Sequence, residues 1–95
     1  MGRKDDQLDV FPTRIVLMKP AADGAARRVY RISVQSDLFG RARLICEWGR
    51  DGRGLQRSVE HHDDEGRAIS ALMQRVAEKR RDGFLQDLTR GTESE

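Results

Sequence analysis

The chain has 95 residues, of which 37% are hydrophobic and 36% are charged, so we expect one compact domain with a thin core. Its formal net charge is only +2, and its single cysteine excludes an intramolecular disulfide. No apolar run approaches the roughly 20 residues of a membrane-spanning helix, and the N-terminus carries acidic residues where a signal peptide is apolar, so we expect a cytoplasmic protein with no membrane partner.

Four segments in the first two thirds of the chain have the composition of β-strands. Residues 14–19, RIVLMK, form a short apolar run that Pro20 ends. Residues 27–35, RRVYRISVQ, alternate apolar and polar side chains with the period of two that is typical of a half-buried strand. Residues 41–50 and 54–62 predict a third and a fourth strand, joined by a tight turn that contains Asp-Gly.

The hydrophobic period changes after residue 63 and becomes that of a helix. One apolar stripe follows the spacing i, i+3, i+4 and i+7 at Ile69, Leu72, Met73 and Val76. We expect Asp63 or Asp64 to cap the start of this helix. The helix is expected to end near Arg81, with Gly83 as its terminator.

Together these elements predict an α+β fold. The expected architecture is a small antiparallel sheet of about four strands with one helix packed across one face. Residues 14–84 would form this domain. Residues 1–13 and 85–95 are polar and are expected to be flexible tails.

Basic residues are concentrated in the predicted strands. Between residues 27 and 57 there are eight arginines, three acidic residues and no lysine. Because arginine forms two parallel hydrogen bonds with phosphate and stacks on planar groups, a nucleic-acid surface is one interpretation of this segment. The other is that the charges solvate the outer face of a sheet and protect its edges.

The only tryptophan, Trp48, precedes Gly49 and Arg50 at the end of the third predicted strand. Trp48 and Arg50 are two residues apart and therefore project from the same face of that strand. Gly49 leaves room for a partner, and a flat ring beside a guanidinium group suits a nucleotide. Leu44 and Cys46 share the parity of Trp48, however, so strict alternation also fits a tryptophan in the core. A bulge near the glycines would instead turn the ring outward.

The residues with metal-binding or catalytic chemistry form no convincing constellation. His61 and His62 are adjacent, and neighbouring residues of a strand point to opposite faces, so a strand end followed by a helix cap explains this segment better than a metal site. Cys46 has no sequence link to either histidine and is typical of a small buried hydrophobic residue. We therefore predict no catalytic residue, no metal and no cofactor, and a chain that is not an enzyme.

The order of these parts resembles the WGR domain, a family named for the tripeptide found here at residues 48–50. The family occurs in poly(ADP-ribose) polymerases and as small bacterial proteins. The resemblance covers about Ile15 to Phe84 and includes Tyr30, Trp48-Gly49-Arg50, Gly54, Gln56 and a helix that closes at Gly83. It implies an antiparallel sheet with a helix packed across it. Family members often carry an Asn-Lys-Phe-like stretch entering the second strand, where this chain has RRVY.

In the polymerases the domain contacts DNA near a strand break. The tryptophan of the motif lies against the nucleotide at a DNA end, and the arginine helps to join the DNA to neighbouring domains. By position these roles fall on Trp48 and Arg50, which implies that the Trp48 ring is partly exposed.

The resemblance and the arginines predict a non-enzymatic module that binds duplex DNA, with a preference for ends or nicks. The residues expected to contact nucleic acid are Trp48, Arg50, Arg53, Arg43, Arg31 and Arg28. The alternative is a protein–protein interaction adaptor that uses the open, arginine-rich face of the sheet.

Overall fold

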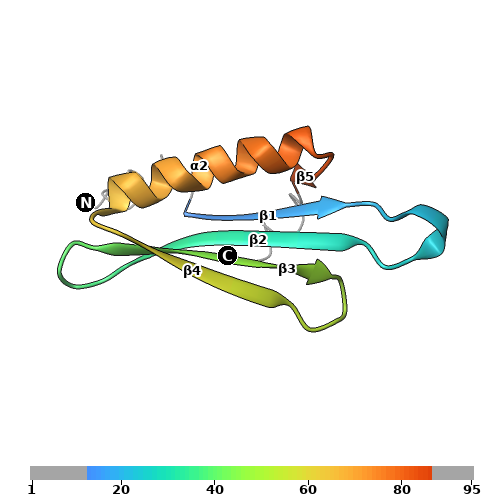
Figure 1. The fold of residues 1–95 in the computed structure, drawn as a ribbon, viewed down its shortest axis with the longest axis horizontal. Coiled ribbons are helices and arrows are strands. Elements are labelled where there is room, and N and C mark those ends of the chain that lie inside the picture. Colours follow the sequence, from blue (N-terminus) through green and yellow to red (C-terminus); the bar gives the residue numbers. More distant parts are fainter. Residues whose placement is uncertain (1–12, 87–95) are drawn as a thin grey trace, which may run out of the picture.

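The structure is a computed structural model that describes residues 13–86 and contains an antiparallel sheet and one long helix (Figure 1). The elements in chain order are β1 (Arg14–Lys19), the 3-10 helix η1 (Ala22–Gly24), β2 (Arg28–Ser36), β3 (Ala42–Arg50), β4 (Gln56–His62), α2 (Glu65–Arg81) and β5 (Leu85–Gln86). The strand order is β4-β3-β2-β1-β5, and every neighbouring pair is antiparallel. The predicted α+β fold is confirmed, with a fifth strand in addition to the four expected.

The strands begin close to where the sequence pattern placed them. β1 has the predicted bounds, and β2, β3 and β4 each begin one or two residues later than expected. Leu85 and Gln86, which the sequence pattern assigned to a tail, form β5 and pair with β1. Thr13, also assigned to a tail, accepts a hydrogen bond from the backbone N–H of Val34 at 2.8 Å. Residues 1–12 and 87–95 of the predicted tails lie outside the described residues.

Helix α2 is capped as its sequence predicts. The Asp64 side chain accepts a hydrogen bond from the backbone N–H of Arg67 at 2.8 Å, which satisfies a donor that the first helical turn leaves open. Gly83 follows the last turn with a φ of 101°, in the left-handed region that glycine adopts at helix ends. Within residues 13–86, no helix is both long and apolar enough to cross a membrane.

The buried stripe of α2 differs from the prediction at Met73 and at Ile69, which is only half-buried, and it includes Ala68, which was not expected. Ala68, Leu72 and Val76 are its buried residues, at intervals of four. Met73, which was expected on the stripe, is 50% exposed. The reason is geometric: successive helical residues are about 100° apart, so a residue next to Leu72 lies at the side of a stripe this narrow.

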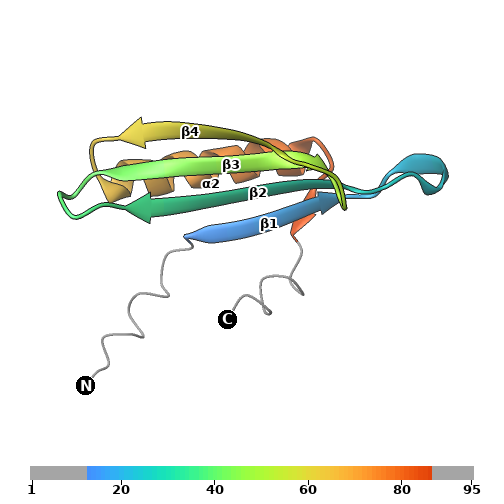
Figure 2. The ribbon, with the colours of Figure 1, turned by 90° about the horizontal axis from the view of Figure 1, so that it is seen from below.

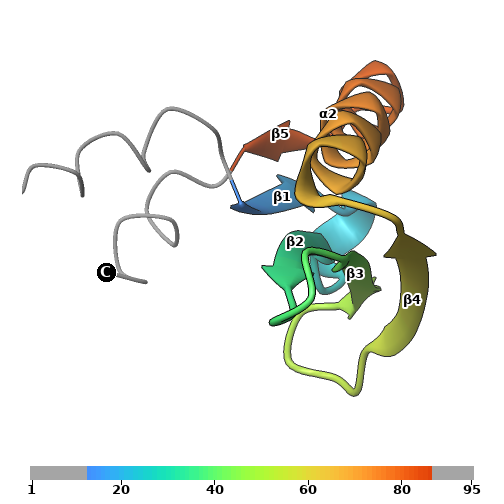
Figure 3. The ribbon, with the colours of Figure 1, turned by 90° about the vertical axis from the view of Figure 1, so that its left-hand side faces the viewer.

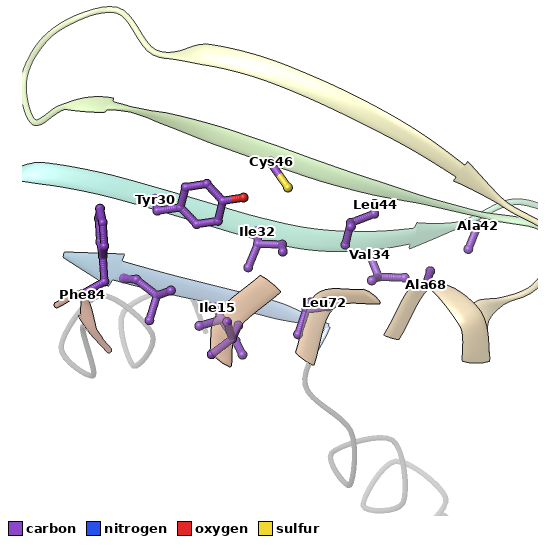
Figure 4. Packing of buried hydrophobic residues seen from close by; sticks show 12 residues of the cluster. Ile15, Tyr30, Ile32, Val34, Ala42, Leu44, Cys46, Ala68, Leu72 and Phe84 are labelled. Carbon is purple, nitrogen blue, oxygen red and sulfur yellow. The ribbon is translucent and has the colours of Figure 1, made fainter. Parts of the chain in front are cut away.

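The larger cluster of buried residues lies between α2 and one face of the sheet, which we call the helix face (Figure 4). Its buried residues are Ile15, Leu17, Tyr30, Ile32, Val34, Ala42, Leu44, Cys46, Ala68, Leu72, Val76 and Phe84. The strand register brings them together, because Ile15, Ile32 and Cys46 are opposite one another on β1, β2 and β3. Figure 3 places α2 along one side of the sheet only. A smaller cluster of buried residues, formed by Val16, Met18 and Val29, lies on the other face.

The other side of the sheet, which we call the open face, is formed by the alternate residues of the same strands. They are Arg14, Val16, Met18, Val29, Arg31, Ser33, Gln35, Arg43, Ile45, Glu47, Gly49, Arg57, Val59 and His61, together with Leu85 of β5, opposite Met18. Viewed from below, β4, β3, β2 and β1 lie side by side in front of α2, and no described helix covers them (Figure 2). Arginines are therefore available to solvent on this face.

Candidate nucleic-acid interface

Trp48 lies on the helix face at the end of β3, opposite Tyr30 of β2 and Gln56 of β4. The regular pairing continues through it, so no bulge redirects the ring. The side chain is half-buried and packs against the edge of the core. Its ring centroid is 6.3 Å from that of Tyr30, at an interplanar angle of 34°, and Tyr30 is in turn 6.3 Å from Phe84. Trp48 therefore belongs partly to the core and retains exposed surface, as the family resemblance implied.

A cleft of about 880 Å³ lies beside these rings. Its lining combines the three aromatic residues with five basic side chains, Lys19, Arg28, Arg50, Arg75 and Lys79, and two acidic ones, Glu78 and Asp82. Both lysines of the lining lie near aromatic rings: Lys79 Nζ is 4.7 Å from the Tyr30 centroid, and Lys19 Nζ is 5.8 Å from that of Phe84. Such cation–π contacts hold positive charge at an aromatic surface.

Gly49, the central residue of the motif, is required by its surroundings. A Cβ at this position would lie 2.9 Å from Leu55 Cδ2 and 3.4 Å from the Gly54 carbonyl oxygen. Its φ of 156° is also rarely adopted by residues with side chains. Because Gly49 has no side chain, residues 54 and 55 can pack directly against its backbone after the turn. Trp48 and Arg50, on either side of it, both point to the helix face.

Arg75 of α2 links the helix to the rings through hydrogen bonds. It donates from Nη2 to Glu60 Oε2 at 2.6 Å, and from Nη1 to the Tyr30 hydroxyl at 3.4 Å and to Cys46 Sγ at 3.6 Å. Glu60 also contacts His62 Nε2 at 3.2 Å. In Figure 4 the Tyr30 hydroxyl points toward Cys46. The network ties α2 to β2, β3 and β4 behind the cleft.

The network shifts the acidity of its members. Burial raises the pKa of Tyr30 to about 12, and the hydrogen bond from Arg75 holds the pKa of Glu60 below its usual value. Hydrogen bonds with Tyr30 and Glu60 raise the pKa of Arg75 further. At neutral pH the network therefore has a neutral phenol, a carboxylate and a permanent cation.

The structure separates the six predicted contact residues into groups. Trp48, Arg50 and Arg28 line the cleft, with Arg50 and Arg28 paired across β3 and β2. Arg53 lies in the turn after β3 and is exposed. Arg31 and Arg43 project from the open face and cannot reach the cleft, because they alternate with residues of the helix face.

Several cleft residues are absent from the sequence-based set of contacts. Lys19, Arg75, Lys79 and Phe84 come from β1, α2 and the segment after it. The sequence contained a signal for Lys79, but its position in the last helical turn had a sufficient explanation in the helix dipole. Their proximity to Trp48 depends on how α2 crosses the sheet.

The histidines and the cysteine occupy ordinary structural positions. His61 lies on the open face, and His62 on the helix face beside Glu60, as alternation predicts. Cys46 is buried in the core with 1% of its surface exposed. Among residues 13–86, no group of three or more histidine, cysteine, aspartate or glutamate side chains is arranged to hold a metal ion.

The sheet, the single helix and the Trp-Gly-Arg strand end define a small binding module. The model of the WGR domain family matches residues 14–91, so the chain belongs to the WGR domain family. An uncharacterized protein of Sinorhizobium fredii, y4dW, is 33% identical over 85 residues, which are 88% of this chain and 42% of that relative. The chain thus spans less than half the length of that relative. No solved structure matches it. WGR domains are in general nucleic-acid-binding modules, and a WGR domain on its own is a binding module.

Proposed function

We propose that this chain binds duplex DNA and prefers ends or nicks, with the cleft beside Trp48 as the end-binding site. The observation that carries the proposal is the convergence of the half-buried Trp48 ring and five basic side chains on one cleft. An aromatic surface takes up the flat face of a base, and the cations take up phosphates.

Preference for an end follows from which base surfaces are accessible. Inside an intact duplex both faces of every base pair are stacked, so an aromatic side chain has no face to contact without unstacking. At an end or a nick one face is free or easily freed. The packing of Trp48 supports such a contact: Tyr30 lies against its ring on the core side, with the two ring centroids 6.3 Å apart, and the Trp48 ring keeps exposed surface.

Phosphate contacts come from the exposed arginines of the strand ends. Arg28 and Arg50 are opposite one another, and Arg50 Nη1 also donates to the Ala26 carbonyl at 3.2 Å, which fixes its direction. Arg53 adds a further charge in the neighbouring turn. Because such contacts are few, log K should fall with log salt with a slope of about −3 to −5, from 0.9 per phosphate.

Trp48→Ala is the central test of this proposal. We expect end binding to weaken by about 1 to 3 kcal/mol, the range that alanine substitution gives for base–aromatic stacking, while binding to closed duplex changes little. Arg50→Ala should weaken both. The measurement is a fluorescence titration with blunt, nicked and covalently closed duplexes at two salt concentrations, on variants whose folding is checked by melting.

Phe39→Ala is the matched control for this test. It also removes an exposed aromatic ring, 79% exposed, but from the turn at the opposite end of the β2–β3 hairpin. It should leave end binding unchanged. A folded Trp48→Ala variant with unaltered selectivity for ends would contradict the role proposed for the ring.

A protein-interaction adaptor is the second candidate, and one observation favours it. Leu38 and Phe39 are 97% and 79% exposed in the β2–β3 turn. Asp37 orders that turn by accepting hydrogen bonds from the backbone N–H groups of Phe39 and Arg41 at 2.7 and 3.0 Å. Exposed apolar side chains on an ordered turn are a common means of contacting another protein. If this function dominates, a cross-linked partner should survive nuclease treatment and be lost with Leu38→Ser and Phe39→Ser.

A further inference from the structure

The open face carries a second concentration of positive charge, separate from the cleft. Four arginines and one glutamate, a net charge of +3, project from it: Arg14, Arg31, Arg43, Arg57 and Glu47. Arg31 Nη1 is 4.0 Å from Glu47 Oε1, a loose pair. Within residues 13–86, Arg14, Arg43 and Arg57 are exposed and form no ion pair.

Three of these arginines, Arg14, Arg31 and Arg57, line a hollow of about 390 Å³ in the open face. Arg31, Glu47 and Arg57 are opposite one another on β2, β3 and β4. Because neighbouring strands lie about 4.8 Å apart, the backbones that carry the two arginines are about 10 Å apart. Arg14 borders the hollow from β1, and Ser33 and Gln35 add polar groups to its lining. One strand of a duplex presents a phosphate about every 3.4 Å along the helix axis, so this width spans about three phosphates.

The remaining side chains of this face distinguish a polyanion from a protein partner. Its large apolar residues are buried: Val16, Met18, Val29 and Ile45 are each no more than 8% exposed. Two exposed apolar side chains remain, both on the edge strands: Val59 of β4 at 40%, and Leu85 of β5, opposite Met18, at 67%. Neither lines the hollow. The centre of a protein interface is enriched in Trp and Tyr as well as Arg, and none of the described residues of this face is Trp, Tyr or Phe, whereas a phosphate backbone requires only the arginines.

We propose that the open face is a second nucleic-acid-binding surface, which holds the phosphate backbone of a duplex segment other than the one at Trp48. The two surfaces lie on opposite sides of one sheet, so one straight duplex cannot contact both. A chain with both surfaces occupied joins two duplex segments. The inference depends on the proposed nucleic-acid-binding function for the class of ligand, but it rests on different residues.

The test removes charge from the open face alone. The variant Arg14→Gln, Arg31→Gln, Arg57→Gln is compared with Arg67→Gln, Arg80→Gln, Arg81→Gln on α2, which removes the same charge away from both surfaces. Affinity for a short, covalently closed duplex should fall at least about tenfold in the first variant, and the salt slope by about 2 to 3, from 0.9 per lost phosphate contact. The α2 variant should stay close to the parent chain. Circular dichroism verifies that both are folded.

Stoichiometry provides the second readout. Sedimentation of the parent chain with excess short blunt duplex should give two duplexes per chain, and the open-face variant should give one. Arg57→Glu, a single exposed change on the edge strand, should also weaken the closed-duplex complex if the triple variant does not fold.

Three results would overturn the inference. They are a single duplex per parent chain at saturation, equal affinities for the open-face and α2 variants, and binding of polyglutamate but not closed duplex through the same arginines. None of them decides the role of the cleft, because Trp48→Ala tests end selectivity independently. Conversely, loss of end selectivity alone would leave the second surface standing.

Discussion

The two faces of the sheet use the same four strands but present different side chains to solvent. On the helix face, apolar residues pack beneath α2, and the aromatic residues Tyr30, Trp48 and Phe84 meet at one end. On the open face, arginines line a shallow hollow and no described helix covers them. Neighbours such as Tyr30 and Arg31 therefore serve different surfaces. Arginines that are close together in the sequence can therefore belong to two different surfaces. Which surface each one belongs to depends on which face of its strand it projects from.

The largest effect should come from a core substitution on the helix face. Leu44 is fully buried there, so Leu44→Ala should reduce the free energy of unfolding by about 2 to 5 kcal/mol. Val59, 40% exposed on the open face, is the matched control, and Val59→Ala should cost less than about 1 kcal/mol. Urea denaturation of both variants gives the values. Similar losses would mean that Val59 is packed as tightly as a core residue and is not at a solvent surface.

A substitution at Gly49 tests how closely the segment after the β3–β4 turn packs against the strand between the two faces. Gly49→Ala places a Cβ 2.9 Å from Leu55 Cδ2 at a φ of 156°, and should cost about 1 to 3 kcal/mol through crowding and backbone strain. Leu55→Ala in the same chain should recover the crowding part only. A double-mutant cycle by thermal unfolding measures this coupling. A neutral Gly49→Ala would show that the turn yields easily.

Much of the fold could be predicted from periodicity. Alternation identified β2, the i, i+3, i+4 pattern identified α2, and Asp-Gly placed the turn after β3. These signals are local, because each depends on residues within one element. The error at Met73 has a different origin: the width of the buried stripe is set by the sheet against which the helix packs, which the helical pattern does not contain.

The candidate site could be predicted only in part, because local patterns do not contain the tertiary packing of the helix on the sheet. Parity alone placed Trp48 and Arg50 on one face, and applied strictly it would also have separated Arg31 and Arg43 from them. No pattern in the sequence indicates that Lys79 lies 4.7 Å from the Tyr30 ring, 49 residues away along the chain. That contact depends on the direction in which α2 crosses the sheet. The contribution of α2 to the cleft is therefore a result of tertiary packing.

The smallest expected change in the free energy of unfolding at neutral pH comes from a substitution of Tyr30. This substitution tests whether the helix face shields the Tyr30 hydroxyl from water. Tyr30→Phe keeps the ring and loses only a hydroxyl that accepts a long, 3.4 Å hydrogen bond from Arg75, so it should cost about 0.5 kcal/mol. The pH dependence is more informative, because burial raises the pKa of Tyr30 to about 12 from 10.0. With the pKa raised, this group's contribution to stability is complete below pH 10.0 and is lost as the pH rises toward about 12.

Absorbance of the phenolate reads this group directly, because Tyr30 is the only tyrosine in the chain. The folded protein should show little phenolate at a pH where the urea-unfolded chain is half ionised, near the ordinary value of 10.0. Tyr30→Phe provides the baseline for tryptophan absorbance. Coincident titration of the folded and unfolded chains would show that water reaches the hydroxyl. The Tyr30 ring that packs against Trp48 would then be accessible to water. The buried character of the helix face would not extend as far as the cleft.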